Sequence, residues 1–395
     1  MANLLNGIRV VENANVITGP LVGMILGDLG ADVVKIENPE GGDQFRGWDA
    51  GTARVNLAFA NYNRGKRSIT LNLRSPAGVQ IFRRIVNESD VVIENFRPGV
   101  ANRLGIGYDE LSKDNPGLVY CEITGMGATG PLHDRPTFDA IAQAMSGLWS
   151  TFTDMDQPQA IGPPMADQLT GIYGACAVLA GLVSRQKTGL GTKVSLNMVS
   201  AAMSFIGAEI SSFVEDDRKG VLREQKKTDR AHGSQSYAFL DSDGKPFAIH
   251  LSSPPKFWEG LCAAVGHPEL ASDPRYDTHG KRIPLYDELH ATLAAFFAGQ
   301  NRDYWIGELT GRDVPCAPIY SPGESLRDPQ IQHLDMLWKD PTSGYSLVRS
   351  PIQHAGQFAA ADGAAPWLGQ HTVEVLSSLG LAEDEIEALR DDGAL

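Results

Sequence analysis

The chain has 395 residues, 42% hydrophobic and 21% charged, which is enough for two domains that each bury a core. Its 34 basic and 48 acidic residues give a net charge of −14, which argues against a general nucleic-acid surface and confines any phosphate site to a local basic pocket. The four cysteines form no CxxC pair, so a zinc ribbon, an iron–sulfur centre and a disulfide framework are not expected.

The N-terminus has no charged leader followed by a long apolar run. No stretch reaches the roughly 20 apolar residues that a membrane span needs. We therefore expect a cytoplasmic protein that binds neither a membrane nor nucleic acid.

The first two hundred residues alternate short β-branched runs with longer helical patterns. Strands are predicted at residues 8–12, 32–37, 67–72, 90–94, 118–123 and 192–197. A helix from Pro20 to Leu29 and another from Pro76, with Ser75 as its N-cap, to about Asn87 would be crossovers between parallel strands. This rhythm predicts an α/β fold with a mainly parallel sheet.

A highly charged stretch at residues 214–230 predicts a linker that ends a large domain of residues 1–213. Strand patterns at 236–240 and 246–251 flank Ser242, Asp243 and Gly244 and predict a hairpin. Helical patterns then dominate to about Leu309. We expect a small α+β domain at residues 231–325.

The last part of the chain, residues 326–395, begins irregularly after Pro315 and ends in two helical patterns at 372–379 and 383–390. These helices are expected to return and pack on the large domain.

Gly125, Gly127 and Gly130 form a GxGxxG pattern directly after a predicted strand. A dinucleotide-binding fingerprint needs its last glycine inside an opening helix, but the prolines that follow delay any helix to about Phe138. The pattern therefore favours a flexible loop over a nicotinamide dehydrogenase. Such a loop can still cover an active site.

Hydrolytic chemistry has little support in this sequence. There is no GxSxG elbow, no HExxH motif and no tight cluster of histidines and acids. We expect no metal site.

Asp167 follows two prolines, Pro163 and Pro164, at the mouth of a small-residue apolar helix predicted at 172–183, which should be buried. An acid at this place is typical of an N-cap or a first helical turn. It also suits a nucleophile, because free backbone amides and the helix dipole would keep a partly buried carboxylate ionised. The residues alone leave both roles open.

Further segments stand in a characteristic order over nearly the whole chain. They are residues 9–37, Asn63–Ile69, Ile93–Gly99, Phe138–Leu148, Ala166–Gly171, Lys187–Asn197 and Asp273–Tyr276. In order and in residues they resemble the signatures of the CaiB/BaiF family, the family III CoA-transferases.

The resemblance implies a large Rossmann-like domain built from both ends of the chain, a smaller α+β domain, and an obligate, interlocked, ring-like homodimer. It also implies that Asp167 attacks an acyl-CoA thioester and passes CoA to an acceptor carboxylic acid. Mixed anhydrides and an aspartyl-CoA thioester would be the intermediates. Coenzyme A or acyl-CoA is then a substrate, and no tightly bound cofactor is implied.

The CoA contacts of the family match six positions of this chain, where arginines suit phosphates and an apolar side chain suits the adenine. They are Val16, Leu71, Arg74, Asn95, Phe96 and Arg103. Candidate substrate-facing or loop residues, which would also exclude water, are Ile17, Trp48, Gly125, Gly127 and Phe138.

The chain departs from the formyl-CoA:oxalate members of the family in three places. Asn38 replaces a CoA-contacting arginine, Ile17 replaces a substrate-facing glutamine, and Ser252 to Pro255 replace a glycine run. Oxalate is therefore not the expected acceptor. Donor and acceptor stay open, and succinyl-CoA with a short dicarboxylate is favoured only by its frequency in the family.

Two other functions fit the same fold. An α-methylacyl-CoA racemase of this fold uses a His/Asp pair, but Phe138 stands where its histidine would be and leaves Asp167 without an evident partner. A non-catalytic CoA-binding dimer would be expected to lose the aspartate, which is present. The sequence therefore favours CoA transfer through Asp167.

Overall fold

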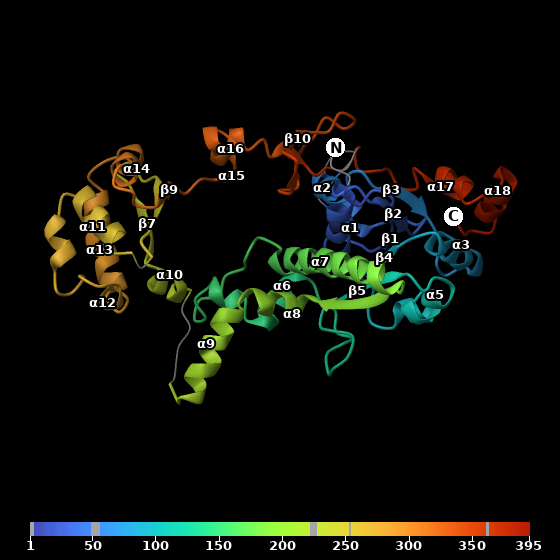
Figure 1. Cartoon of the computed structure of the whole chain (residues 1–395), viewed down its shortest axis with the longest axis horizontal. Coiled ribbons are helices and arrows are strands. Elements are labelled where there is room, and N and C mark those ends of the chain that lie inside the picture. The colour runs from blue at the N-terminus through green and yellow to red at the C-terminus, as the bar shows by residue number, and fades with distance from the viewer. Residues whose placement is uncertain (1–3, 49–55, 222–226, 253, 361–362) are drawn as a thin grey trace. The chain divides into compact units, whose positions relative to one another are not determined.

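The computed structural model describes residues 4–48, 56–221, 227–252, 254–360 and 363–395 (Figure 1). They form two compact units, which are described separately. The larger unit contains residues 1–149, 160–222 and 335–395, and the smaller unit contains residues 150–159 and 223–334.

The predicted linker at residues 214–230 differs from the structure at its start. Its first residues continue a helix, α9 (Gly207–Arg218), and residues 222–226, with Arg223 and Lys226 of the charged stretch, lie outside the described residues.

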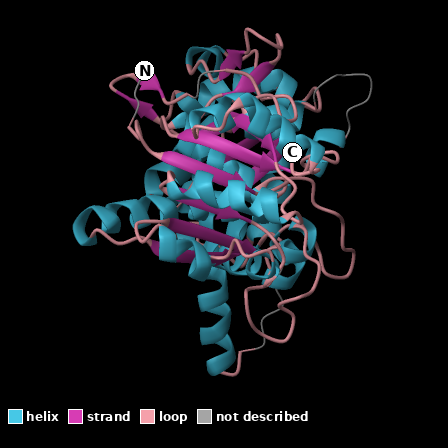
Figure 2. Ribbon diagram, turned by 90° about the vertical axis from the view of Figure 1, so that its right-hand side faces the viewer, coloured by secondary structure: helices cyan, strands magenta, loops and turns pink. Residues whose placement is uncertain are grey.

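A six-stranded parallel sheet forms the centre of the larger unit (Figure 2). Its strands are β1 (Arg9–Asn13), β2 (Asp32–Glu37), β3 (Arg67–Thr70), β4 (Val91–Glu94), β5 (Val119–Thr124) and β6 (Thr192–Asn197). They lie in the order β3–β2–β1–β4–β5–β6, and every pairing is parallel. The six predicted strands and the mainly parallel sheet are thus confirmed.

Helices cover both faces of this sheet (Figure 2). The adjacent residues Val10 and Val11 of β1 belong to different core clusters because successive side chains of a strand point to opposite faces. On the Val10 face lie α1 (Thr18–Asp28) and α7 (Met165–Thr188). On the Val11 face lie α3 (Pro76–Asn87), α5 (Tyr108–Asp114), α17 (Thr372–Ser378) and α18 (Glu383–Asp391).

Shorter elements complete the larger unit. They are α2 (Leu57–Asn63), α4 (Val100–Arg103), α6 (Asp139–Ser146), α8 (Met198–Phe205), and the hairpins of β10 (Leu337–Lys339) with β11 (Ser346–Val348) and β12 (Gln353–His354) with β13 (Gln357–Phe358).

The smaller unit is built on an antiparallel sheet with the order β7–β8–β9. The strands β7 (Ser236–Leu240) and β8 (Pro246–His250) form the predicted hairpin, and β9 (Cys316–Pro318) pairs with β8. Its helices are α10 (Asp229–Ser234), α11 (Pro255–Ala264), α12 (His279–Arg282), α13 (Tyr286–Phe297), α14 (Arg302–Thr310), α15 (Pro322–Ser325) and α16 (Pro329–His333). Of the segment that replaces the glycine run, Ser253 lies outside the described residues and Pro255 begins α11.

Helix α7 packs against α1 with one face only. A Cβ atom at Gly171 would lie 2.6 Å from Leu21, so the close approach of the two helices requires glycine there. The other face of α7 leaves Ile172, Tyr173 and Val183 between 42% and 54% exposed. The helix that was expected to be buried is thus half-buried in the single chain.

By length and composition, α7 qualifies as a membrane span, and the bent pair of α8 and α9 would be a second if it counts as one span. Because α7 contains Asp167, Arg185 and Lys187, it has no run of about 20 apolar residues and does not contradict the prediction from the sequence. Half of the qualifying stretch of α7 is buried inside the fold.

A cluster of buried charges lies beneath the turn from β1 into α1. The carboxylate of Glu12 lies 2.9 Å from Lys35 Nζ and 2.6 Å from Lys66 Nζ, and Lys35 Nζ lies 3.0 Å from Asp43. A Cβ atom at Gly23 would lie 1.9 Å from Glu12 Oε2, so α1 can close over the cluster only with glycine at this position.

The two lysines of this cluster respond differently to burial. Burial alone would lower the pKa of Lys35, but the charges of Glu12 and Asp43 raise it above its ordinary value. For Lys66 burial prevails, and it lowers the pKa to about 8 against the attraction of Glu12.

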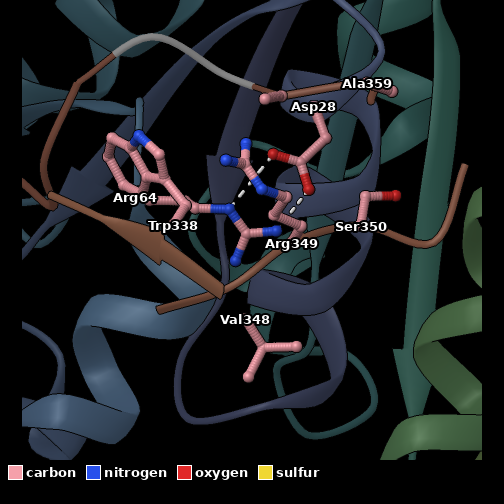
Figure 3. Close-up of a pocket in the computed structure, with 8 residues that line it drawn as sticks. Asp28, Arg64, Trp338, Val348, Arg349, Ser350 and Ala359 are labelled. Atoms are coloured by element: carbon pink, nitrogen blue, oxygen red, sulfur yellow. Dashed lines mark hydrogen bonds and ion pairs between the residues drawn. The ribbon is translucent and has the colours of Figure 1, made fainter. Parts of the chain in front are cut away.

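A second buried ion pair joins Arg64, which follows α2, to Asp28 at the end of α1 (Figure 3). Arg64 Nε lies 3.2 Å from Asp28 Oδ1. The same small gap of about 10 Å³ is lined by Trp338, Val348 and Arg349, so the hairpin of β10 and β11 closes over this ion pair. The gap has room for about one water molecule and none for a substrate.

Replacing Glu12 by glutamine is expected to destabilise the protein by about 3–5 kcal/mol, because it leaves the buried Lys66 without a carboxylate and Lys35 with Asp43 alone. Urea unfolding at neutral pH measures this. The matched control is Glu110→Gln, which removes an exposed partner of Lys113 and should cost less than about 1 kcal/mol. Equal losses in the two variants would contradict a structural role for the cluster.

Candidate active site

A cleft of about 450 Å³ opens in the larger unit where the chain leaves β1, β4 and β5. Open α/β sheets bind ligands at the carboxyl ends of their strands, where the strand order reverses. Here the order reverses between β1 and β4. Seven of the predicted site residues line this cleft: Val16, Ile17, Asn95, Phe96, Gly125, Phe138 and Asp167.

Asn95, at the end of β4, fixes the turn after β1. Its Oδ1 accepts a hydrogen bond from Asn15 N at 2.9 Å, and its Nδ2 donates to Asn15 O at 2.8 Å and to Thr18 Oγ1 at 3.0 Å. The carboxamide thus joins the two strands on either side of the switch point. Its hydrogen bonds fix the turn after β1 against the end of β4, which both line the cleft.

Asp167 is the third residue of α7. The carboxylate of Asp139 accepts a hydrogen bond from a backbone amide at the start of this helix. Asp139 is the first residue of α6, and its Oδ1 accepts a hydrogen bond from Asp167 N at 3.1 Å. The buried Gln143, one turn further along α6, donates to the other oxygen of Asp139 and to Pro163 O at 3.1 Å. Asp167 therefore lies in the first turn without serving as the cap, and its side chain faces the cleft.

The electrostatic environment of Asp167 differs from the one expected. Burial, with a contribution from the negative charge of Asp139, raises the pKa of Asp167 from 3.8 to about 7. Burial is the larger of the two causes, and it acts against the helix dipole, which favours the ionised form. Asp139 lies beside Asp167, but it contacts the backbone amide of Asp167, and the histidine position of a racemase is still occupied by Phe138.

The glycine loop runs from the end of β5 to the start of α6 as predicted, without an opening helix after the glycines. A Cβ atom at Gly125 would lie 2.3 Å from Thr137 Cβ, so the two ends of the loop meet only with glycine there. Gly125 and Thr137 both line the cleft, whereas Gly127, with φ of 108°, does not.

The remaining predicted residues also lie away from the cleft lining. Leu71 is 1% exposed and belongs to the core between the sheet and α3, so its side chain offers no surface to an adenine. Trp48 is exposed and packs edge-on against Phe45, with ring centroids 5.3 Å apart.

Arg74 and Arg103 are exposed, and for neither guanidinium does the described part of the chain supply an ion-pair partner. Arg103 Nη1 lies 3.2 Å from the place of a Cβ atom on Gly99, which directly precedes α4. Phe96 is partly buried against the same core cluster as Leu71.

Sequence reasoning missed several residues of the site. Asp139 and Gln143 were not recognised as supports of Asp167, although an acid at a helix start with a glutamine four residues later is a usable signal. Gln168, next to Asp167, donates a hydrogen bond to the Tyr62 hydroxyl. Arg97, His133 and Arg135 line the cleft, and the two arginines place positive charge there, as a phosphate site on this acidic chain would require.

A model of CoA-transferase family III matches residues 5–372 of the chain. The chain belongs to this family. It is 34% identical over 401 residues to succinyl-CoA:glutarate CoA-transferase of Mus musculus, and the alignment covers 99% of this chain and 90% of that protein. It is also 34% identical over 391 residues to succinate–glutarate CoA-transferase of Agrobacterium fabrum, covering 96% of each.

A solved structure of a CaiB/BaiF family protein from Brucella suis is 33% identical, with a TM-score of 0.83, and covers 96% of this chain and 100% of that one. The family predicted from the sequence is thus confirmed, and the chain is a family III CoA-transferase. Within the described ranges, no group of three or more His, Cys, Asp or Glu side chains could hold a metal ion.

Replacing Asp167 by asparagine is expected to stabilise the protein relative to wild type, increasingly as the pH rises. The native pKa of Asp167, about 7, lies above the ordinary 3.8, so proton binding favours the native state. That contribution is fully present below about pH 3.8 and is lost as the pH rises through about 7. Asp167→Asn should therefore gain on the order of 4 kcal/mol relative to wild type between about pH 4 and about pH 8.

Thermal unfolding of both proteins across this pH range measures the effect. Asp109→Asn, at an exposed acid in α5, corrects for general pH effects. A difference between Asp167→Asn and wild type that does not change with pH would contradict the raised pKa.

Proposed function

We propose that this family III member moves CoA from an acyl-CoA to an acceptor carboxylic acid, with Asp167 as the nucleophile. One observation carries the proposal: Asp167 lines a cleft that also contains basic residues, at the place where the strand order of the sheet reverses. Asp139 holds the start of α7, the helix that contains Asp167, through a hydrogen bond from Asp167 N. A carboxylate is the chemically matched nucleophile for this exchange, because one carboxylate replaces another on the acyl group.

The first half-reaction begins when an oxygen of Asp167 attacks the thioester carbonyl. The carbon–sulfur bond breaks, CoA leaves as the thiolate, and a mixed anhydride remains. The thiolate then attacks the Asp167 carbonyl. The donor acid departs with the bridging oxygen, and an aspartyl-CoA thioester is left.

The second half-reaction runs this sequence in reverse with the acceptor. The acceptor carboxylate attacks the aspartyl thioester, CoA leaves again, and the thiolate attacks the acceptor carbonyl. Asp167 is released as a carboxylate with one oxygen from the acceptor. The overall reaction exchanges one carboxylate for another on a thioester and is nearly neutral in energy, so the chain must mainly position the reactants and exclude water.

The raised pKa of Asp167 suits this role. A carboxylate with a pKa of about 7 is more basic, and therefore more nucleophilic, than an ordinary aspartate. A substantial fraction is still ionised near neutral pH. The chemistry uses only the carboxylate of the chain and the thiol of CoA, so we propose no tightly bound cofactor.

For the CoA moiety we propose the surface around Phe96, where Arg74 and Arg103 are exposed and unpaired among the described residues. Guanidinium groups bind phosphates with two parallel hydrogen bonds. The side chain of Leu71 lies in the core, so its part in this site is limited to its backbone.

For the substrates we propose succinyl-CoA and a short dicarboxylic acid. The relatives from Mus musculus and Agrobacterium fabrum carry succinate or succinyl-CoA together with glutarate in their names. The apolar Ile17 lines the cleft, and Arg97 and Arg135 supply positive charge there for a second carboxylate or for phosphates.

We further propose that a second copy of the chain covers exposed apolar surface of the larger unit. None of the residues of α9 is buried, and Phe213 and Val214 are 48% and 57% exposed. The exposed face of α7 adds to this surface. Exposed apolar surface of this extent is typical of a protein interface.

The racemase alternative lacks a proton-transfer group where it needs one. Phe138 lines the cleft and is 58% exposed, so an apolar ring occupies the position of the racemase histidine. Asp139 is close to Asp167, but its carboxylate is engaged by Gln143 and by the amide of Asp167.

The test is chemical trapping of Asp167. The protein is incubated with a panel of acyl-CoAs and then with hydroxylamine, which converts an activated aspartyl group to a hydroxamate that mass spectrometry locates. We expect the adduct at Asp167 with productive donors, and a loss of roughly 10³-fold or more in kcat for Asp167→Asn. Asp109→Asn is the matched control, since it removes an exposed acid of α5 and keeps the nucleophile and its surroundings. A donor that supports turnover without modifying Asp167 would overturn the proposal.

A further inference from the structure

Val16 holds a backbone conformation that its side chain disfavours. Its φ is 68°, in the left-handed region, where β-branched residues are rare because Cβ approaches the backbone too closely. Val16 lies between β1 and α1, and both it and the following Ile17 line the cleft that contains Asp167. Some part of the structure must therefore hold the turn in this shape.

The carboxylate of Asp43 provides that hold. Val16 N donates to Asp43 Oδ1 at 3.1 Å and to Asp43 Oδ2 at 3.2 Å. Asp43 is fully buried, and its own backbone N donates to Glu37 Oε2 at 3.0 Å. Its charge is balanced by Lys35, whose Nζ lies 3.0 Å from Oδ2. The acceptor that faces Val16 is thus fixed by an ion pair and by the backbone.

The residues on the N-terminal side of Val16 are fixed as well. Lys35 Nζ donates to Ala14 O at 2.7 Å, and the Asn95 side chain binds both the N and the O of Asn15. With these neighbours held, the chain can enter α1 only through a sharp change of direction at Val16. The left-handed conformation follows from this geometry.

We propose that Asp43 is a positioning residue for the acyl-CoA substrate: it holds Val16 in the left-handed conformation and so sets the part of the cleft wall formed by Val16 and Ile17. Asp43 acts through Val16 and touches no substrate. The inference rests on the proposed function, because acyl-CoA is the ligand that the wall is assumed to receive.

A double-mutant cycle tests this role through coenzyme A binding, measured by isothermal titration calorimetry on the full chain. Asp43→Ala removes the acceptor, so Val16 should leave its left-handed conformation and the affinity should fall about tenfold, a coupling of ordinary size for residues in contact. Val16→Gly removes the need for the acceptor, because glycine adopts this conformation freely. In the Val16→Gly background, Asp43→Ala should therefore change the affinity by less than about twofold.

The matched control is Asp328→Ala, since Asp328 also accepts from two backbone amides but lies in the smaller unit. It should leave the affinity unchanged. An equal loss from Asp43→Ala in both backgrounds, or no loss in either, would overturn the role of Asp43. Wild-type protein that binds no coenzyme A would overturn the proposed function first, and this role with it.

If Asp43→Ala alone does not fold, the cycle is read by thermal unfolding. The role of Asp43 then requires that the double variant Val16→Gly/Asp43→Ala regain a cooperative transition. A double variant that stays unfolded would show that Asp43 acts mainly on the buried charge cluster, and it would contradict the inference.

Discussion

The structure of the cleft depends on the buried charges of Glu12, Lys35, Asp43 and Lys66. Isolated charges are very costly to bury, so each of these groups is stable inside the protein only in contact with another. Glu12 comes from β1 and Lys35 from β2, while Lys66 directly precedes β3. The ammonium groups also bind the carbonyls of Ala14 and Pro20, on either side of the turn into α1. The same contacts that compensate the charges therefore fix the backbone that lines the cleft.

Asp167 shows the opposite arrangement. Among the described residues no cation compensates its burial, and the charge that acts on it, that of Asp139, has the same sign. The result is a carboxylate whose pKa is raised to about 7, whereas in the paired cluster the charged form of Lys35 is stabilised and burial lowers the pKa of Lys66 only to about 8. Strongly perturbed groups in clefts are candidates for chemistry because the structure holds them in an unfavourable state. The chain thus separates charges that stabilise the scaffold from the carboxylate that we propose as the nucleophile.

Much of the fold could be predicted because its causes are local. Buried parallel strands are β-branched runs, and Pro76 marks a helix start, so β2 and α3 were located to the residue. The contact of Asp139 with Asp167 joins residues far apart in sequence and depends on how α6 and α7 pack. The raised pKa of Asp167 depends on burial, which a motif does not express. The left-handed conformation of Val16 could not be predicted for the same reason. Valine rarely adopts this conformation, and only the surrounding contacts impose it.

The central claim is that Asp167 takes part covalently, and oxygen transfer tests it most directly. The acceptor acid is labelled with ¹⁸O in its carboxylate, and the peptide that contains Asp167 is examined by mass spectrometry after turnover. Because the acceptor oxygen bridges the second anhydride and leaves with the aspartate, the mechanism predicts labelled oxygen in Asp167. The contrary result is that product and ¹⁸O-labelled donor acid form while Asp167 stays unlabelled. It would mean that the two acids exchange CoA without the aspartate, and it would contradict this account.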